Sequence, residues 1–239
     1  MTITLFIPCF VDAIYPKVGI SMVQILERLG HTVLCPEEVP ACCGQPAFNS
    51  GYWEDARRMA APVLEVLKEA EAIVVPSGSC GAMLKVFYTQ LFAKTPQAEA
   101  ALALSKKTWE LSDFLVNKLG VTDLGASFPA KVTFHDGCHG LRELGIKHEP
   151  RALLKQVRGL ELIEMEGCET CCGFGGTFAA KFPAISTAMG ENKCSNAVAT
   201  GAEYIVSNDS SCLMQVQGLL SRQGGKMKTI HLAEILAQS

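Results

Sequence analysis

The sequence has 239 residues, of which 49% are hydrophobic and 19% are charged, enough for one large domain or two of about 120 residues each. This composition excludes the disordered and low-complexity classes of protein. The net charge is −3 with histidine neutral, and no run of Lys or Arg exceeds two residues, which argues against nucleic acid or an anionic membrane as the main partner.

The N-terminal segment and the cysteine content indicate the cellular compartment. The first cation is Lys17, so the basic region of a secretory signal is missing, and no stretch approaches the roughly 18 apolar residues of a membrane span. We therefore expect a cytoplasmic protein without a membrane span. Eleven cysteines in such a protein favour metal or redox chemistry over disulfide bonds.

The first half of the chain alternates short apolar runs with segments that have apolar residues at helical spacing. In chain order, these patterns predict a strand over residues 2–8, a helix over 18–29, a strand over 31–35, a helix over 53–70, a strand over 72–76 and a helix over 109–119.

The second half predicts the same series of elements. They are a strand over residues 131–136, a helix over 150–157, a strand over 161–165, a helix over 182–200, a strand over 204–208 and a helix over 231–237. Strands that alternate with helices predict an α/β fold, in which each half has a small, mainly parallel sheet flanked by helices.

The cysteine pattern is duplicated in the same register as these elements. Cys42 follows Cys9 by 33 positions, Cys171 follows Cys138 by 33 positions, and each begins a Cys-Cys-Gly tripeptide. One further cysteine follows the second cysteine of each tripeptide, after 37 positions in the first half and 40 in the second. The sequence therefore predicts two tandem modules related by a pseudo-twofold axis, residues 1–125 and 126–239, joined near residues 121–130.

Each module brings four cysteines to the carboxyl ends of its predicted strands, where ligands bind in open α/β sheets. The quartets are Cys9, Cys42, Cys43 and Cys80 in the first module and Cys138, Cys171, Cys172 and Cys212 in the second. Four thiolates from three loops suit an iron–sulfur cluster or a structural zinc ion. Because the cysteines are far apart in sequence except for the adjacent pair, we favour an iron–sulfur cluster in each module, with zinc as a possible substitute.

This pattern resembles the cysteine-rich CCG domain family over nearly the full chain. The similarity is greatest to the lactate utilization protein A branch, in the segments VPACCGQPAFNSG, VVPSGSCGAM, FHDGCHGLRELG, CETCCGFGGTFAAKFPAIS and IVSNDSSCLMQVQG. The cysteine-rich subunit of heterodisulfide reductase and the iron–sulfur subunit of glycolate oxidase resemble the chain more distantly. The resemblance implies an iron–sulfur electron-transfer subunit of a cytoplasmic complex that oxidises L-lactate to pyruvate. It also implies two partners, a ferredoxin-like iron–sulfur subunit and a third subunit.

The chain departs from the wider family pattern at the last cysteine of each module. That pattern ends in Cys-x-x-Cys, whereas this sequence has Ser77 before Cys80 and Asp209 before Cys212. The loss of one thiolate per module favours a four-cysteine [4Fe–4S] cluster over the five-ligand cluster of the heterodisulfide reductase relatives. Asp209 or Ser77 is a weaker candidate as an oxygen ligand.

Other polar and thiol groups are secondary candidates. Cys168 forms Cys-x-x-Cys with Cys171, but its counterpart in the first module is Val39, so a turn residue is favoured over a ligand. Two further cysteines are expected to be packing thiols, and two cations near the second quartet could bind a carboxylate or simply be solvated. These are Cys35 and Cys194, and Arg142 and Lys181.

The second quartet has polar neighbours where the first has apolar ones. His135, Asp136 and His139 surround Cys138, and the equivalent residues of the first module are Phe6, Ile7 and Phe10. One interpretation is that Asp136 caps a turn and the histidines bond to backbone groups. The other is that His135 and His139 tune the second cluster to a higher potential by N–H donation to sulfur and take part in proton transfer. They are the only candidate catalytic residues.

Three functions remain open at this stage. The chain could be the electron-transfer subunit of an L-lactate dehydrogenase-type complex, a cluster-based thiol–disulfide reductase subunit or a structural zinc-binding scaffold. No P-loop, strand-linked G-x-G-x-x-G or H-E-x-x-H motif occurs, so nucleotide binding and zinc hydrolysis have no support. If electrons pass to a partner, we expect an exposed apolar surface near the clusters.

Overall fold

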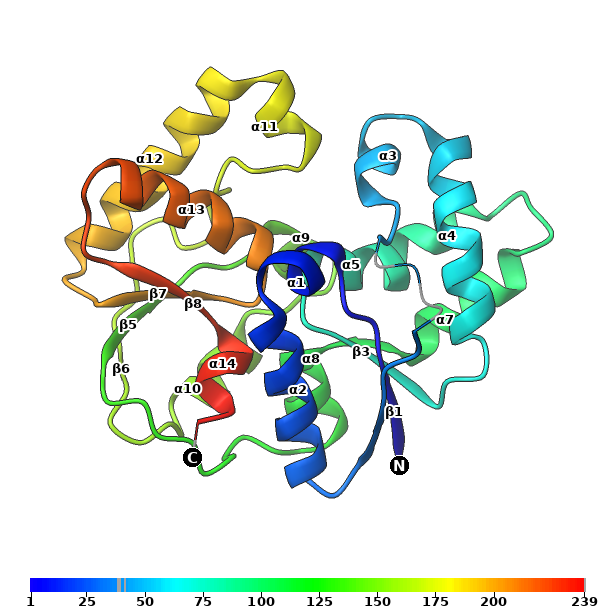
Figure 1. Cartoon of the computed structure of the whole chain (residues 1–239), viewed down its shortest axis with the longest axis horizontal. Coiled ribbons are helices and arrows are strands. Elements are labelled where there is room, and N and C mark those ends of the chain that lie inside the picture. The colour runs from blue at the N-terminus through cyan, green and yellow to red at the C-terminus, as the bar shows by residue number, and fades with distance from the viewer. Residues whose placement is uncertain (38–39, 41, 239) are drawn as a thin grey trace.

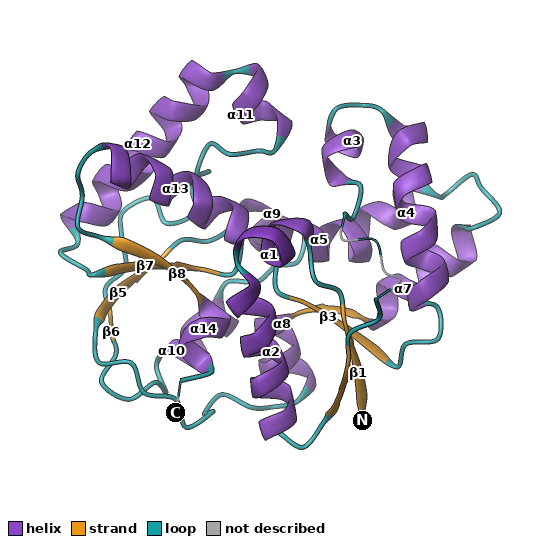
Figure 2. Ribbon diagram, viewed as in Figure 1, coloured by secondary structure: helices purple, strands orange, loops and turns teal. Residues whose placement is uncertain are grey.

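The computed structural model describes residues 1–37, 40 and 42–238 and contains two α/β modules that lie side by side (Figure 1). Each module has one sheet of four parallel strands, with helices packed around it (Figure 2). The predicted fold class and the two tandem modules are therefore confirmed.

The first sheet contains β1 (Thr2–Leu5), β2 (Thr32–Leu34), β3 (Ala72–Val75) and β4 (Thr108–Glu110). The strand order is β2-β1-β3-β4, so β1 and β3 lie at the centre. Ile3 pairs with both Val33 and Ala72, which fixes the register of the first three strands. Because helices cover the sheet, β3 consists entirely of buried apolar residues, as is typical of parallel sheets.

The second sheet repeats this topology with β5 (Lys131–Phe134), β6 (Glu161–Leu162), β7 (Tyr204–Ser207) and β8 (Lys228–His231). The order is β6-β5-β7-β8, and all neighbours are parallel. Val132 pairs with Leu162 on one side and Tyr204 on the other. The carboxyl ends of β1 and β3, and of β5 and β7, therefore lead into equivalent loops of the two modules.

Helices connect the strands and cover the sheets. In the first module they are α1 (Cys9–Ile14), α2 (Pro16–Arg28), α3 (Gln45–Asn49), α4 (Trp53–Leu67), α5 (Gly78–Ala82), the π-helical turn η1 (Met83–Phe87), α6 (Tyr88–Leu91), α7 (Ala98–Lys107), α8 (Leu111–Asp113) and the π-helical turn η2 (Phe114–Lys118). In the second module they are α9 (Cys138–Arg142), α10 (His148–Leu154), α11 (Thr177–Lys181), α12 (Pro183–Ala199), α13 (Ser210–Arg222) and α14 (Leu232–Leu236). None of the helices in the described residues is both long enough and apolar enough to cross a membrane.

The sequence did not predict the fourth strand of either sheet. The predicted helices over residues 109–119 and 231–237 are confirmed over most of their length by α8, η2 and α14, but β4 and β8 end at Glu110 and His231, directly before these helices. Glu110 and His231 end these strands, and each accepts a hydrogen bond from the backbone of the next turn. A strand can therefore pass directly into a helix without a connecting loop.

The modules meet in a backbone-to-backbone contact between α5 and α9. A Cβ atom on Gly78 would lie 2.8 Å from the Cα of Gly140. Beside this contact, Ser77 and Asp209 form an antiparallel bridge, and the Asp209 carboxylate accepts hydrogen bonds from the Ser79 N–H at 2.9 Å and the Ser77 hydroxyl at 3.3 Å. Ser77 and Asp209 are equivalent positions of the repeat, so this bridge lies on the pseudo-twofold axis.

One hydrophobic core extends across the boundary between the modules. It includes Ile25 and Leu115 from the first module and Phe134 and Ile235 from the second, all of them buried. Helix α2 of the first module packs against α14 of the second. The modules therefore share apolar surface that neither could bury alone.

The contact between the two glycines leads to a stability prediction. We expect Gly78→Ala to lower the free energy of unfolding by about 1–3 kcal/mol, because the added methyl group would overlap backbone atoms of Gly140. Backbone atoms cannot move aside by a change of rotamer, as a side chain could. Denaturant unfolding followed by circular dichroism measures the change.

Gly218→Ala is the matched control for this prediction. A Cβ atom at Gly218, on α13, would meet no described atom within 4 Å. Alanine at this helical position should therefore raise the free energy of unfolding by about 0.5–1 kcal/mol. Unchanged stability of the Gly78→Ala variant would show that the two backbones are not in close contact.

Candidate metal centre

All eight cysteines of the two predicted quartets line a single cavity between the modules. The cavity has a volume of about 100 Å³, and its wall also contains Phe10, Phe174, His139 and Asp209. Loops from the carboxyl ends of both sheets contribute to it. The structure therefore brings the two quartets to a common site, whereas the sequence alone predicts only that each quartet assembles within its module.

The first quartet is assembled from three segments. Cys9 begins α1 after β1, Cys80 lies in α5 after β3, and the adjacent pair Cys42 and Cys43 precedes α3. The sulfur atoms of Cys43 and Cys80 are 3.3 Å apart, and both side chains are buried. The hydroxyl of Tyr88 donates a hydrogen bond of 3.0 Å to the Cys43 carbonyl, which holds the loop in place.

The second quartet has the same construction, and a glycine fixes its loop. Gly173 follows the adjacent pair Cys171 and Cys172 with a φ of 86°, and a Cβ atom there would lie 2.4 Å from the carbonyl oxygen of Ser186. Only glycine satisfies both the left-handed conformation and the close packing. The Gly173 N–H donates a hydrogen bond of 3.3 Å to the Cys171 sulfur. Backbone N–H groups at this turn can thus stabilise negative charge on sulfur.

Hydrogen bonds between the cysteines shift their pKa values in opposite directions. A hydrogen bond from Cys9 lowers the pKa of Cys42 to about 6, although burial opposes the shift, and the same contact raises the pKa of Cys9. Hydrogen bonds from Cys138 and Cys172 hold the pKa of Cys171 far below its ordinary value. Each quartet therefore contains a thiolate at neutral pH, and thiolate is the form that binds metal ions.

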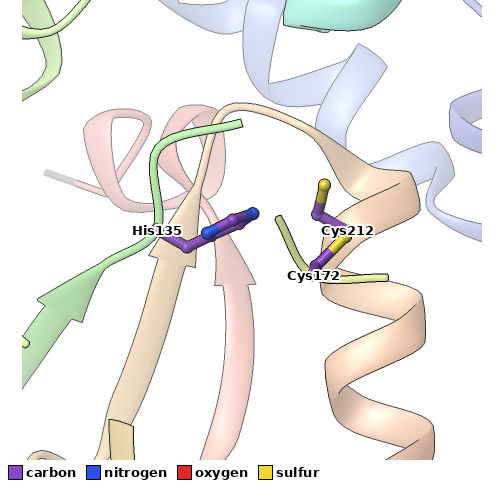
Figure 3. Close-up of side chains that lie close together, drawn as sticks. All are labelled: His135, Cys172 and Cys212. Carbon is purple, nitrogen blue, oxygen red and sulfur yellow. The ribbon is translucent and has the colours of Figure 1, made fainter. Parts of the chain in front are cut away.

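The second quartet has a histidine as an additional neighbour. A ring nitrogen of His135 and the sulfur atoms of Cys172 and Cys212 all lie within 4.8 Å of one another, and the three residues are buried. Figure 3 shows the imidazole ring extending from the end of β5 toward the two cysteines. His139 is placed differently, since it lines the cavity, its Nδ1 lies 3.1 Å from a Glu143 oxygen, and its ring meets Phe87 edge-on.

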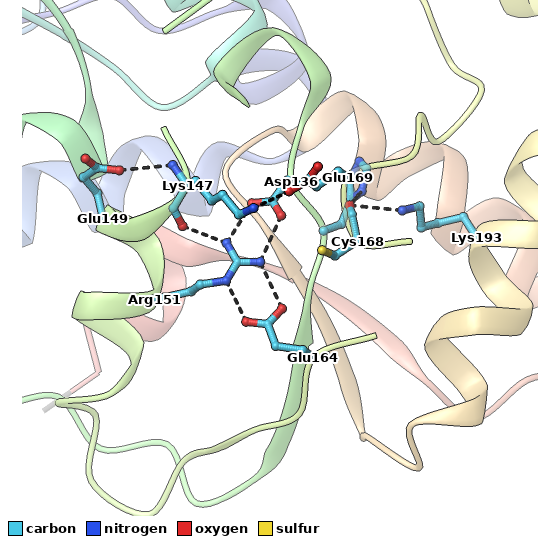
Figure 4. A network of polar contacts seen from close by, with 9 residues as sticks. Asp136, Lys147, Glu149, Arg151, Glu164, Cys168, Glu169 and Lys193 are labelled. Atoms are coloured by element: carbon cyan, nitrogen blue, oxygen red, sulfur yellow. Dashed lines mark hydrogen bonds and ion pairs between the residues drawn. The ribbon is translucent and has the colours of Figure 1, made fainter. Parts of the chain in front are cut away.

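Asp136 forms a buried ion pair, so the prediction that it caps a turn is wrong. Its two oxygens accept hydrogen bonds of 2.8 and 2.9 Å from the guanidinium of Arg151, which also binds Glu164 (Figure 4). Only 1% of the Asp136 side chain is exposed, so an unpaired charge there would be costly. The expectation that the histidines bond to backbone groups agrees with His135, whose Nδ1 lies 3.3 Å from the Cys168 carbonyl oxygen.

Asp209 and Ser77, the two weaker candidates for oxygen ligands, are engaged in hydrogen bonds at the module boundary. Oδ1 of Asp209 accepts from the backbone N–H and the hydroxyl of Ser211, while Oδ2 accepts from Ser77 and Ser79. Ser77 also accepts a hydrogen bond from the Cys80 N–H. These contacts give both side chains a structural role in placing the last cysteine of each quartet.

The remaining candidates lie away from the cavity. Cys194 is buried in α12, which confirms the predicted packing role, whereas Cys35 is exposed after β2, so the same prediction is wrong for it. Cys168 approaches the site through its backbone carbonyl, and its first-module counterpart, Val39, lies outside the described residues. Neither Arg142 nor Lys181 is among the described residues that line the cavity, and both are exposed.

Lys193 is a site residue that the sequence analysis missed. It is fully buried in α12, and its ammonium group contacts the carbonyl oxygens of Gly167 and, at 3.1 Å, Cys168 (Figure 4). Burial lowers the pKa of Lys193. Lys193 shares the buried face of α12 with Ser186, Gly190, Cys194 and Ala197. This helical spacing is the sequence feature from which its burial could have been predicted.

The fold and the thiol-lined cavity define a two-module cysteine-rich protein. The sequence matches the CCG family, described as a cysteine-rich domain, at residues 3–85 and again at residues 132–217. A relative named lactate utilization protein A from Shouchella clausii is 46% identical over 99% of this chain and 98% of its own length. The protein of the same name from Bacillus subtilis is 44% identical over 99% of both chains. The chain therefore belongs to the cysteine-rich CCG domain family, in its lactate utilization protein A branch.

A solved structure shows the same fold at low sequence identity. A hypothetical protein from Helicobacter pylori matches 98% of this chain with a TM-score of 0.70 and 12% identity, and this chain spans 48% of that protein. The likeness supports the two-module arrangement and carries no information on function.

The pKa shifts predict which cysteines react first with an alkylating reagent. In the reduced, metal-free protein at pH 7, we expect iodoacetamide to modify Cys42 and Cys171 before Cys35, because the thiolate is the nucleophile. Cys35 is the most exposed of the three, but partial desolvation and Glu27 raise its pKa. Peptide mass spectrometry at several reaction times gives the order.

The pH dependence separates the two reactive cysteines. Labelling of Cys42 should decline as the pH falls through about 6, where its thiolate becomes protonated, while Cys171 continues to react. Labelling of Cys35 should increase only at alkaline pH. Faster labelling of Cys35 than of Cys42 and Cys171 at pH 7 would contradict the pKa assignments.

Proposed function

We propose that the protein is an iron–sulfur electron-transfer subunit of a cytoplasmic complex that oxidises L-lactate to pyruvate. The observation that carries this proposal is the arrangement of eight cysteines, in two matched quartets, around one cavity. Cys9, Cys42, Cys43 and Cys80 would hold one [4Fe–4S] cluster, and Cys138, Cys171, Cys172 and Cys212 the other. The lactate substrate rests on the names of the relatives, which cover the full chain.

The donor set fits iron–sulfur clusters. Thiolates are the usual ligands of such clusters, and the contact between Cys43 and Cys80 shows that sulfurs from separate loops converge. Bound clusters would supply one-electron storage at two neighbouring positions. The chain itself supplies thiolates, turn N–H groups that stabilise charge on sulfur, and apolar side chains such as Phe10 and Phe174, which meet edge-on at 5.3 Å beside the cavity.

An exposed apolar surface near the cavity is the proposed contact with the partner subunits. Helix α3 lines the cavity, and the α3–α4 and α11–α12 pairs project on the same side of the molecule (Figure 1). Large apolar side chains are exposed on these pairs or next to them, namely Tyr52, Trp53, Phe182 and Ile185. A ferredoxin-like iron–sulfur subunit and a third subunit are the partners that the family resemblance implies, and such a surface suits a protein partner.

Two other functions have some support from the same site. The reactive thiolates would also suit a thiol–disulfide reductase subunit. The cluster of His135, Cys172 and Cys212 has the donor types of a zinc site and would suit a structural scaffold. Electron transfer is favoured because both modules bring a full set of four thiols to the cavity, whereas zinc at the histidine site would leave the first quartet unexplained.

Metal analysis tests the cluster assignment. Protein purified without oxygen should contain iron and acid-labile sulfide and show a brown colour that dithionite bleaches. Cys172→Ser should remove about half of the iron and sulfide, because only the second quartet loses a ligand. Cys194→Ser, which alters another buried thiol of the same module, should leave both unchanged. Stoichiometric zinc without iron or sulfide would favour the scaffold.

Substrate-dependent bleaching tests the reaction. When the protein is combined with its partner subunits without oxygen, L-lactate should bleach the cluster absorbance because electrons from lactate enter the clusters. D-lactate serves as the control, since an enantiomer matches the substrate in every bulk property. Oxidation of the reduced clusters by a disulfide, with no bleaching by L-lactate, would instead support the reductase function.

A further inference from the structure

The side chain of His135 has one ring nitrogen without a hydrogen-bond partner. The residue is 1% exposed, and among the described residues no group makes a hydrogen bond of normal distance and angle with its Nε2 atom. A buried polar atom normally has a partner, so we expect the Nε2 atom to have one beside the second quartet. Figure 3 shows the ring directed at Cys212 and Cys172, with its outer nitrogen toward them.

The other ring nitrogen determines where the proton lies. Nδ1 is 3.3 Å from the carbonyl oxygen of Cys168, and a carbonyl can only accept a hydrogen bond. Nδ1 therefore carries the hydrogen, and in the neutral ring Nε2 presents a lone pair. The N–H group of His135 thus points away from the cysteine sulfurs, and the atom that faces them presents a lone pair rather than a hydrogen.

The Cys168 carbonyl is itself held in position by several groups. It accepts hydrogen bonds of 3.1 Å from the Asp136 N–H and from the ammonium of Lys193. The Asp136 side chain is fixed in turn by Arg151 (Figure 4). A metal-bound histidine almost always donates its second N–H to a carbonyl or carboxylate, which sets its tautomer and orientation. The surroundings of His135 have this arrangement.

Among the described residues of the first module, neither the imidazole nor the buried lysine has an equivalent. The position that corresponds to His135 is occupied by Phe6, which is fully buried. Because α4 and α12 pack against equivalent glycines of the two modules, Val63 takes the place of Lys193. The imidazole and the buried lysine therefore occur at only one of two equivalent positions, which points to a local function rather than to a requirement of the fold.

We propose that Nε2 of His135 is a nitrogen ligand to the cluster held by the second quartet. This inference rests on the proposed function, since it requires a cluster at that site. The second site then offers five donors to four irons, so one iron would have an imidazole in addition to its thiolate, whereas each iron of the first cluster would have one thiolate. Imidazole is neutral, so as an added ligand it brings no negative charge, whereas a fifth thiolate would lower the reduction potential.

Pulsed electron paramagnetic resonance tests the ligand directly. The protein is purified without oxygen, with natural or ¹⁵N-labelled histidine, and its clusters are reduced with dithionite. We expect one cluster signal to show a strong histidine nitrogen coupling, of the size found for Rieske imidazoles, that changes with the isotope. His135→Phe, which introduces the residue of the first module, should abolish this coupling. His139→Phe, which alters the histidine that lines the cavity, should retain it.

The possible outcomes separate the two proposals. Absence of iron and sulfide would overturn the proposed function and this assignment together. Iron and sulfide without a strong nitrogen coupling in the native protein would overturn the ligand assignment alone, as would a coupling that persists in His135→Phe. If the His135→Phe protein loses the second cluster, the nitrogen coupling is measured in His135→Gln instead. The change of the coupling with ¹⁵N-labelled histidine in the native protein then still decides the ligand assignment.

Discussion

The architecture depends on the approach of two backbones at Gly78 and Gly140. At 2.8 Å from an added Cβ atom to the facing Cα, this contact leaves no room for a side chain on α5. It brings α5, which follows β3, against α9, which follows β5, and these helices carry Cys80 and Cys138. Because the shared core extends through both modules, the contact cannot relax without exposing apolar surface. The common cavity is a direct consequence of this packing.

Within that cavity, the same ligands are placed in different surroundings. Both quartets have an adjacent cysteine pair followed by a glycine with positive φ, so the thiols converge in the same way. At the first quartet, the position that corresponds to His135 holds the buried apolar ring of Phe6. Around the second lie a buried imidazole, a buried ion pair and a buried lysine. The electrostatic environment of each quartet is therefore determined by residues outside the quartet.

Features of the fold with a local or periodic signal in the sequence could be predicted. The duplicated Cys-Cys-Gly pattern and the apolar runs predicted both modules, their central strands and the convergence of cysteines at strand ends. The strands β4 and β8 were missed, since strands of three or four residues that pass directly into helices have no turn between them to mark a boundary. Arg151 and Lys193 were also missed, because a cation on a predicted helix looks solvated until the fold shows what it faces. The spacing of residues along the sequence does not show which side chains of a distant segment such a cation will contact.

The bridge between Ser77 and Asp209 has a consequence for how a duplicated protein can diverge. In a symmetric homodimer of a single module, a residue on the twofold axis meets its own copy. Two aspartates there would repel each other in a buried place, and two serines would supply no charged acceptor for the Ser79 N–H. Covalent fusion of the copies removes this restriction, because each can mutate separately. The pairing of a hydroxyl with a carboxylate on the axis is an arrangement that a symmetric homodimer cannot encode.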